Sequence, residues 1–142
     1  MKYYADENAF KLFACDLGLM GAMTDTKAAD VLSGGRVFEE YKGAFTEQYI
    51  FQQFLAATGK PPYYYTNNRS TMEIDFAAEG TSVYAIEVKA EENLRSKSLK
   101  TVLADYPDIT GWRFSMSGYR EQERLINIPL FLAEEWFRAH GD

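Results

Sequence analysis

The sequence predicts an α/β fold in which helices flank a mixed central sheet. Three observations support this class. A long helical pattern occupies residues 38–58 and ends at Gly59, which is followed by two prolines. Three strand-like runs come next, separated by clusters of turn residues. A second helical pattern and a further alternating strand follow, so the expected order is helix, strand, strand, strand, helix, strand.

The elements are expected in three parts of a single domain. Residues 1–36 form a lead-in segment, with a strand at 11–15 and a short helix that Thr24 or Asp25 caps and that runs through Leu32. Residues 37–118 form the core; its strands are expected at 63–66, 72–78, 83–90 and 112–117, and its second helix at 96–106 with Ser96 as the cap. Residues 119–142 add a short strand at 125–128 and a terminal helix.

Composition limits the class of protein. A chain of 142 residues with 46% hydrophobic content is large enough to bury a core as one domain. The single Cys15 has no partner for an internal disulfide, and no secretory signal or membrane-length apolar run is visible, so we expect a cytoplasmic protein that does not enter a membrane. The net charge of −6 argues against a general nucleic-acid coat protein. It leaves a nuclease open, because bound metal ions reverse the local charge.

Charged residues interrupt two neighbouring strands that otherwise have buried patterns. If the turn between them centres near Thr81, Asp75 lies opposite Glu87, and Lys89 follows on the face of Glu87. The expected apolar face of this hairpin holds four residues, Ile74, Phe76, Ile86 and Val88. Asp75 and Glu87 are hard oxygen ligands of the kind that Mg²⁺ or Mn²⁺ takes. Lys89 could then stabilise charge on a phosphate or orient a water.

Two further elements extend this candidate site. Glu47 lies on the apolar stripe of the long helix, where an acid usually has a partner or a function, so we predict that it assists the metal or the attacking water. Three basic residues, Arg95, Lys97 and Lys100, begin the helix after the second charged strand. A helix in this position starts near the end of a sheet where ligands bind, so these residues are candidates for contact with nucleic acid, Lys97 above all.

The ordered motifs resemble the PD-(D/E)xK nuclease superfamily. The chain is more closely similar to the uncharacterised domain at the C-terminus of many bacterial and archaeal AAA-type ATPases. The segments that carry this likeness span nearly the whole chain: Lys11-Leu12-Phe13, Asp16-Leu17-Gly18-Leu19, Lys42 to Gln48, Glu73 to Phe76, Ile86 to Ala90, Arg95 to Leu99 and Leu125 to Leu130.

This resemblance implies a restriction-endonuclease-like core. It places Asp75 and Glu87 at the metal positions, Lys89 at the catalytic lysine and Glu47 at the helix acid. The chain departs from the pattern twice. Ile74 stands where the superfamily name has proline, and no phosphate-binding loop of an ATPase is present, because Gly34-Gly35 is followed by Arg36-Val37.

Several functions therefore stay open. The first is a Mg²⁺- or Mn²⁺-dependent phosphodiesterase, a hydrolase that acts on DNA or RNA. The second is a catalytically silent regulatory or interaction module of an AAA-type ATPase, in the same chain or as a separate partner. A single-strand binder without activity fits the acidic balance less well. Association with a second copy of the chain also stays open. The alternative for the hairpin is a half-exposed ribbon whose charges form ordinary cross-strand pairs.

Overall fold

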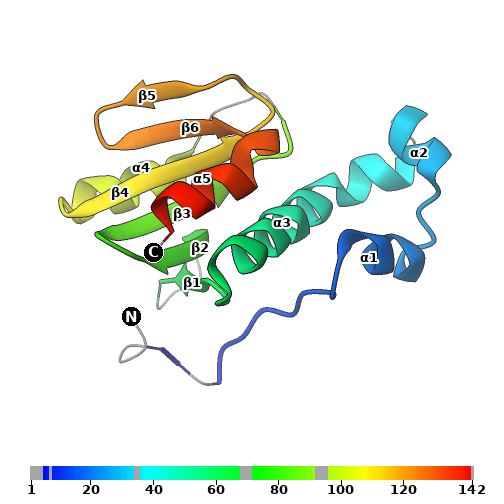
Figure 1. Cartoon of the computed structure of the whole chain (residues 1–142), viewed down its shortest axis with the longest axis horizontal. Helices are drawn as coiled ribbons and strands as arrows, with labels where there is room; N and C mark the ends of the chain where they lie inside the picture. The colour runs from blue at the N-terminus through cyan, green and yellow to red at the C-terminus, as the bar shows by residue number, and fades with distance from the viewer. Residues whose placement is uncertain (1–4, 7, 34–35, 68–71, 92–95, 142) are drawn as a thin grey trace.

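The computed structural model describes residues 5–6, 8–33, 36–67, 72–91 and 96–141, which form a mixed α/β domain (Figure 1). In chain order its elements are α1 (Leu17–Met23), α2 (Ala28–Ser33), α3 (Arg36–Thr58), β1 (Tyr63–Thr66), β2 (Glu73–Glu79), β3 (Val83–Val88), α4 (Lys97–Asp105), β4 (Ile109–Ser115), β5 (Arg120–Gln122), β6 (Leu125–Pro129), the 3-10 turn η2 (Leu130–Leu132) and α5 (Ala133–His140). None of the described helices is both long enough and apolar enough to cross a membrane.

The six strands form one mixed sheet in the order β1-β2-β3-β4-β6-β5. Antiparallel pairing joins β1 to β2 and β2 to β3, whereas β3, β4 and β6 are parallel. The connection from β3 to β4 passes through α4, as a parallel pair requires. The predicted order of helix, three strands, helix and strand is confirmed by α3 through β4. Because β3 and β4 are parallel, their carboxyl ends lie at the same end of the sheet, which is where open α/β sheets usually bind ligands.

The helices cover both faces of the sheet (Figure 1). On one face, α3 and α5 pack through Ile50, Phe54 and Phe137 against the largest core cluster, which includes Phe76 and Trp112. On the other face, the buried residues of α4 form a smaller cluster with side chains of the sheet: Leu99, Val102, Leu103, Ile74, Ala85 and Leu125. The N-terminal half of α3 extends beyond the sheet and carries α1 and α2 at its side.

Several expectations about the elements are corrected. Residues 11–15 form no strand, because the side chain of Gln48 bonds both the N–H and the carbonyl of Ala14, at 2.9 and 3.0 Å, in place of a neighbouring strand. Neither α1 nor β5 was expected, β3 ends at Val88 and not at residue 90, and β4 begins three residues earlier than expected. Ser96 stands at the N-cap of α4, but its side chain makes no capping hydrogen bond.

The predicted register of the charged hairpin is confirmed, but one of its faces is not. The pairing of β2 with β3 follows the predicted register from Glu79 opposite Val83 to Phe76 opposite Ile86, where it ends. The predicted pair of Asp75 and Glu87 lies just past the paired residues. Along β1, however, Tyr63 pairs with Ala77 and Tyr65 with Ile74, so β2 holds one extra residue between these pairs. Such a bulge reverses the alternation of side chains. Ile74 therefore packs in the cluster of α4, whereas Phe76, Ile86 and Val88 share the cluster of α3. The expected apolar face is wrong for Ile74.

Candidate functional site

Asp75 lies in this bulge, where β2 and β3 separate. Its Oδ2 accepts a hydrogen bond from the backbone N–H of Val88 at 2.7 Å, so the carboxylate takes the place of a backbone partner in the ladder. Burial raises the pKa of Asp75 to about 6; the Val88 N–H and the charge of Lys11 act against this, while the charges of Glu47 and Glu87 add to it. Among the described residues, no basic side chain forms an ion pair with Asp75. Asp75 is thus a desolvated carboxylate whose charge no described basic side chain pairs directly.

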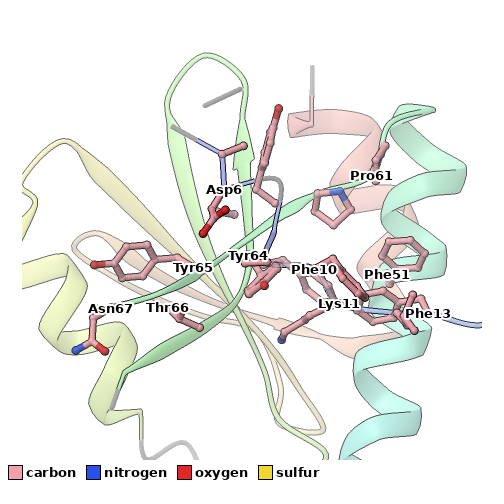
Figure 2. A pocket seen from close by; sticks show the side chains of 17 residues that line it. Asp6, Phe10, Lys11, Phe13, Phe51, Pro61, Tyr64, Tyr65, Thr66 and Asn67 are labelled. Carbon is pink, nitrogen blue, oxygen red and sulfur yellow. The ribbon is translucent and has the colours of Figure 1, made fainter. Parts of the chain in front are cut away.

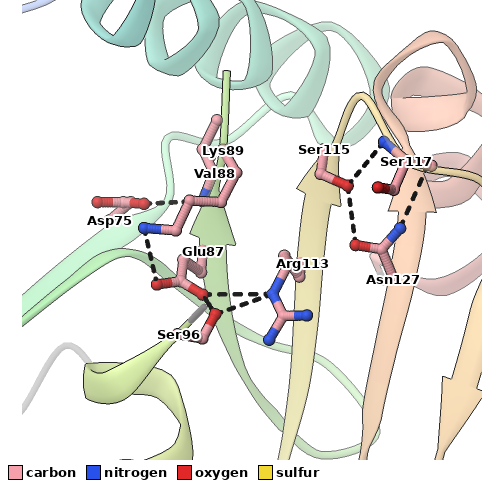
Figure 3. A network of polar contacts seen from close by, with 9 residues as sticks. All are labelled: Asp75, Glu87, Val88, Lys89, Ser96, Arg113, Ser115, Ser117 and Asn127. Atoms are coloured by element: carbon pink, nitrogen blue, oxygen red, sulfur yellow. Dashed lines mark hydrogen bonds and ion pairs between the residues drawn. The ribbon is translucent and has the colours of Figure 1, made fainter. Parts of the chain in front are cut away.

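Glu87 is the second carboxylate and is bound on both of its oxygens (Figure 3). Its Oε1 lies 3.2 Å from Lys89 Nζ. Its Oε2 accepts a hydrogen bond from the hydroxyl of Ser96 and lies 3.5 Å from Arg113 Nε, which also donates to Ser96 Oγ at 2.9 Å. Only 7% of Glu87 is exposed, so the alternative of a water-facing ribbon does not hold for this residue. Two positive charges compensate the burial of its negative charge.

Glu47 and Lys89 reach the hairpin from different sides. Lys89 lies directly after the end of β3, contacts Glu87 and is about one-third exposed. Glu47 projects from α3, and its charge contributes to the raised pKa of Asp75. Its direct partner is Lys11, whose Nζ lies 2.8 Å from Glu47 Oε1. The structure therefore brings all four predicted residues to one region, but Glu47 joins through a lysine of the lead-in segment.

Lys11 and Arg113 are the residues of this region that the sequence analysis missed. Lys11 Nζ also lies 2.5 Å from Glu73 Oε1, so it bridges α3 and β2. Nothing in the sequence around Lys11 signals this long-range contact. Arg113 is 3% exposed and stands opposite Glu87 in the parallel ladder of β3 and β4. A cation in the middle of a buried strand was a signal that the sequence analysis could have used to find it.

The predicted nucleic-acid contacts lie at the start of α4. Lys97 and Lys100 are both exposed on this helix, next to the buried Ser96. Arg95 lies outside the described residues. Lys97 therefore lies one residue, and Lys100 one helical turn, from Ser96, whose hydroxyl bonds Glu87. Neither lysine is buried, so both are available to an anionic ligand.

The side chains of this region could hold a divalent cation only if the protein supplies few of its ligands and water supplies the rest. No group of three or more His, Cys, Asp or Glu side chains in the described part of the chain is arranged to hold a metal ion. Mg²⁺ usually takes one or two protein carboxylates and keeps several waters, so a pair is enough. Asp75 fits this requirement, because it is a desolvated carboxylate whose only described hydrogen-bond donor is an amide. Glu87 fits it if its Oε1 exchanges Lys89 for the cation.

Two cavities lie elsewhere on the domain. One, of about 880 Å³, is bounded by the lead-in segment and β1, and its wall includes Lys11, Phe13, Phe51 and Tyr64 (Figure 2). The other, of about 850 Å³, lies between α1, α2 and α3 and is mostly apolar. Neither is lined by Asp75, Glu87, Lys89 or Glu47. Lys11 is the residue that links the first cavity to the acidic side chains.

One family model, described as "Domain of unknown function (DUF4143)", matches residues 42–130. The chain belongs to this family. The DUF4143 match begins within α3 and ends at Leu130, so it includes Glu47, the whole sheet and the residues around Glu87, but not Lys11. No curated protein and no solved structure matches the chain. The DUF4143 description names no activity, so the function has to be argued from the site.

Proposed function

We propose that this domain is a Mg²⁺- or Mn²⁺-dependent phosphodiesterase that acts on DNA or RNA. The observation that carries the proposal is Asp75, a partly buried carboxylate beside Glu87 with a pKa raised to about 6 and no ion-pair partner among the described residues. Desolvation of an unpaired carboxylate costs stability, and such groups concentrate at functional sites. A cation bound there would offset that cost.

Each residue around Asp75 would have a separate role in the reaction. Asp75 and Glu87 would hold the cation, which would polarise a phosphoryl oxygen and lower the pKa of a bound water. Lys89 is close enough to Glu87 to stabilise negative charge on a phosphate at the same place. Glu47 acts on the electrostatics of Asp75 from α3. Lys97 and Lys100, exposed at the start of α4, would contact the phosphate backbone.

The order of elements supports a restriction-endonuclease-like core as part of this proposal. A helix with an acid precedes β1, an Asp lies on β2, and Glu-x-Lys spans the end of β3 before a parallel crossover to β4. The bulge at Asp75 adds to the support, because bulges are frequent next to active sites, where they redirect a side chain.

Metal binding and cleavage test the proposal separately. Titration calorimetry with Mn²⁺ should detect binding to the wild-type protein, and Asp75→Asn and Glu87→Gln should abolish it. Glu79→Gln, an exposed change at the opposite end of β2, is the matched control and should bind normally. Lys89→Ala should keep metal binding but lose cleavage of plasmid, single-stranded DNA or RNA. If the wild-type protein binds no Mn²⁺ at millimolar concentration, the proposal fails.

One observation favours a second function. Both oxygens of Glu87 are already bound by Lys89, Ser96 and Arg113, which is the arrangement expected of a carboxylate kept for structure. The domain would then be a catalytically silent regulatory or interaction module of an AAA-type ATPase. In that case Glu87→Gln would lower the free energy of unfolding, and no cleavage would be detected with any metal. Cleavage that depends on Lys89 would exclude the silent module.

A further inference from the structure

The groups that surround Lys11 favour a positive charge at its position. Its ammonium group contacts Glu47 at 2.8 Å and Glu73 at 2.5 Å. It also lies 5.3 Å from the ring centre of Tyr64 and 5.9 Å from that of Phe76, both of which attract cations through their faces. Its positive charge also acts on Asp75. Lys11 is therefore the internal cation on the α3 side of the acidic residues.

The position of Lys11 is fixed by the segment that follows it. Phe13 stacks on Phe51 of α3, with ring centres 4.1 Å apart and planes at 5° (Figure 2). One turn apart on the same helix, Gln48 and Gln52 bind the backbone of residues 14 and 17. Gln48 is 2% exposed, so these bonds are protected from water. The lead-in segment is thus held to α3, and Lys11 is held with it.

We propose that Lys11 competes with a divalent cation for the acidic residues and so sets the metal affinity of the site. The inference rests on the proposed function, since it assumes that Asp75 and Glu87 hold the metal. With Asp75 ionised, the described residues of this region bring four carboxylates against three cationic groups: Asp75, Glu47, Glu73 and Glu87 against Lys11, Lys89 and Arg113. One net negative charge attracts a divalent cation weakly, and removal of Lys11 would double that charge.

The proposal also gives the lead-in segment a role outside the DUF4143 match. Residues 42–130 supply the carboxylates, but the competing charge comes from Lys11. A change that shifts the segment from α3 would therefore change metal affinity without touching a metal ligand. Lys11 acts through charge and does not have to touch the metal, so it is a positioning residue of the site.

Titration calorimetry with Mn²⁺ at pH 7.5 and low ionic strength tests the proposal on the full chain. Lys11→Met should raise the affinity for Mn²⁺ by about tenfold or more, because a positive charge that acts on Asp75 is lost. Lys11→Arg keeps the charge and should bind as the wild type does. The matched control is Lys42→Met: Lys42 also pairs with two glutamates, Glu39 and Glu91, each at 2.8 Å, but has no part in the acidic region. It should leave the affinity unchanged.

The outcomes separate this inference from the proposed function. If Lys11→Met and the wild type bind Mn²⁺ equally, the competition is refuted while the metal site stands. If Lys11→Met binds more weakly, Lys11 supports the site and the proposal is overturned. If neither protein binds Mn²⁺, the proposed function fails and the competition fails with it. Lys11→Gln is a second neutral variant that can still donate to Glu47, so the test does not depend on the folding of Lys11→Met.

Discussion

Replacing Asp75 with asparagine is expected to stabilise the protein at neutral pH. The carboxylate is largely buried in the bulge of β2, and burial raises its pKa from the ordinary value of 3.8 to about 6. Asparagine has nearly the same shape, stays neutral, and keeps an oxygen that can accept the hydrogen bond from the N–H of Val88. The substitution therefore removes the cost of a buried charge without opening a cavity.

The direction of the pH dependence follows from the raised pKa. A carboxyl group whose pKa is higher in the folded protein favours folding when it is protonated. That contribution is fully present below pH 3.8 and is lost as the pH rises through about 6. The difference between the two pKa values corresponds to a free energy of about 3 kcal/mol. Above pH 7, Asp75→Asn should therefore be more stable than the wild type by an amount of this order.

Urea unfolding measured from pH 4 to pH 8 in the presence of EDTA checks this expectation. The stability difference between Asp75→Asn and the wild type should be small near pH 4, grow between pH 4 and 6, and reach a plateau above pH 7. Glu79→Gln, exposed on the same strand, should show no comparable gain. A difference that is constant with pH, or an Asp75→Asn protein that is less stable at pH 7.5, would refute the argument that Asp75 is a strained buried carboxylate.

Local patterns were sufficient for the core elements and for part of the site. The helical period of residues 38–58 and the turn residues around Gly80 indicated α3 and the β2–β3 hairpin closely enough to predict the register of the pairs from Phe76 to Glu79. Lys89 follows Glu87 by two residues, directly after the end of β3, so their contact is a local property of the chain. These predictions succeeded because each depends on a few adjacent residues.

The remaining features depend on contacts between distant segments. The bulge at Asp75 adds one residue without changing the apolar pattern of β2, so the sequence analysis placed Ile74 and Phe76 on one face. The expected strand at residues 11–15 has strand-like composition, but Gln48 bonds its backbone from α3, which no local pattern shows. The restriction-endonuclease-like topology and the binding of metal at the site stay predictions.

Two further substitutions test the contacts that hold the site together. Arg113→Met should lower the free energy of unfolding by about 3–5 kcal/mol, because Glu87 would lose a buried positive partner. Adding Glu87→Gln should recover part of this loss. A double-mutant cycle measured by urea unfolding in which the two effects are additive would contradict the pairing. Gln48→Ala removes two protected hydrogen bonds to Ala14 and should cost about 2 kcal/mol. The lead-in segment of Gln48→Ala should also become more susceptible to limited proteolysis than that of the wild type. Equal cleavage rates would mean that the stacking of Phe13 on α3 holds the segment without Gln48.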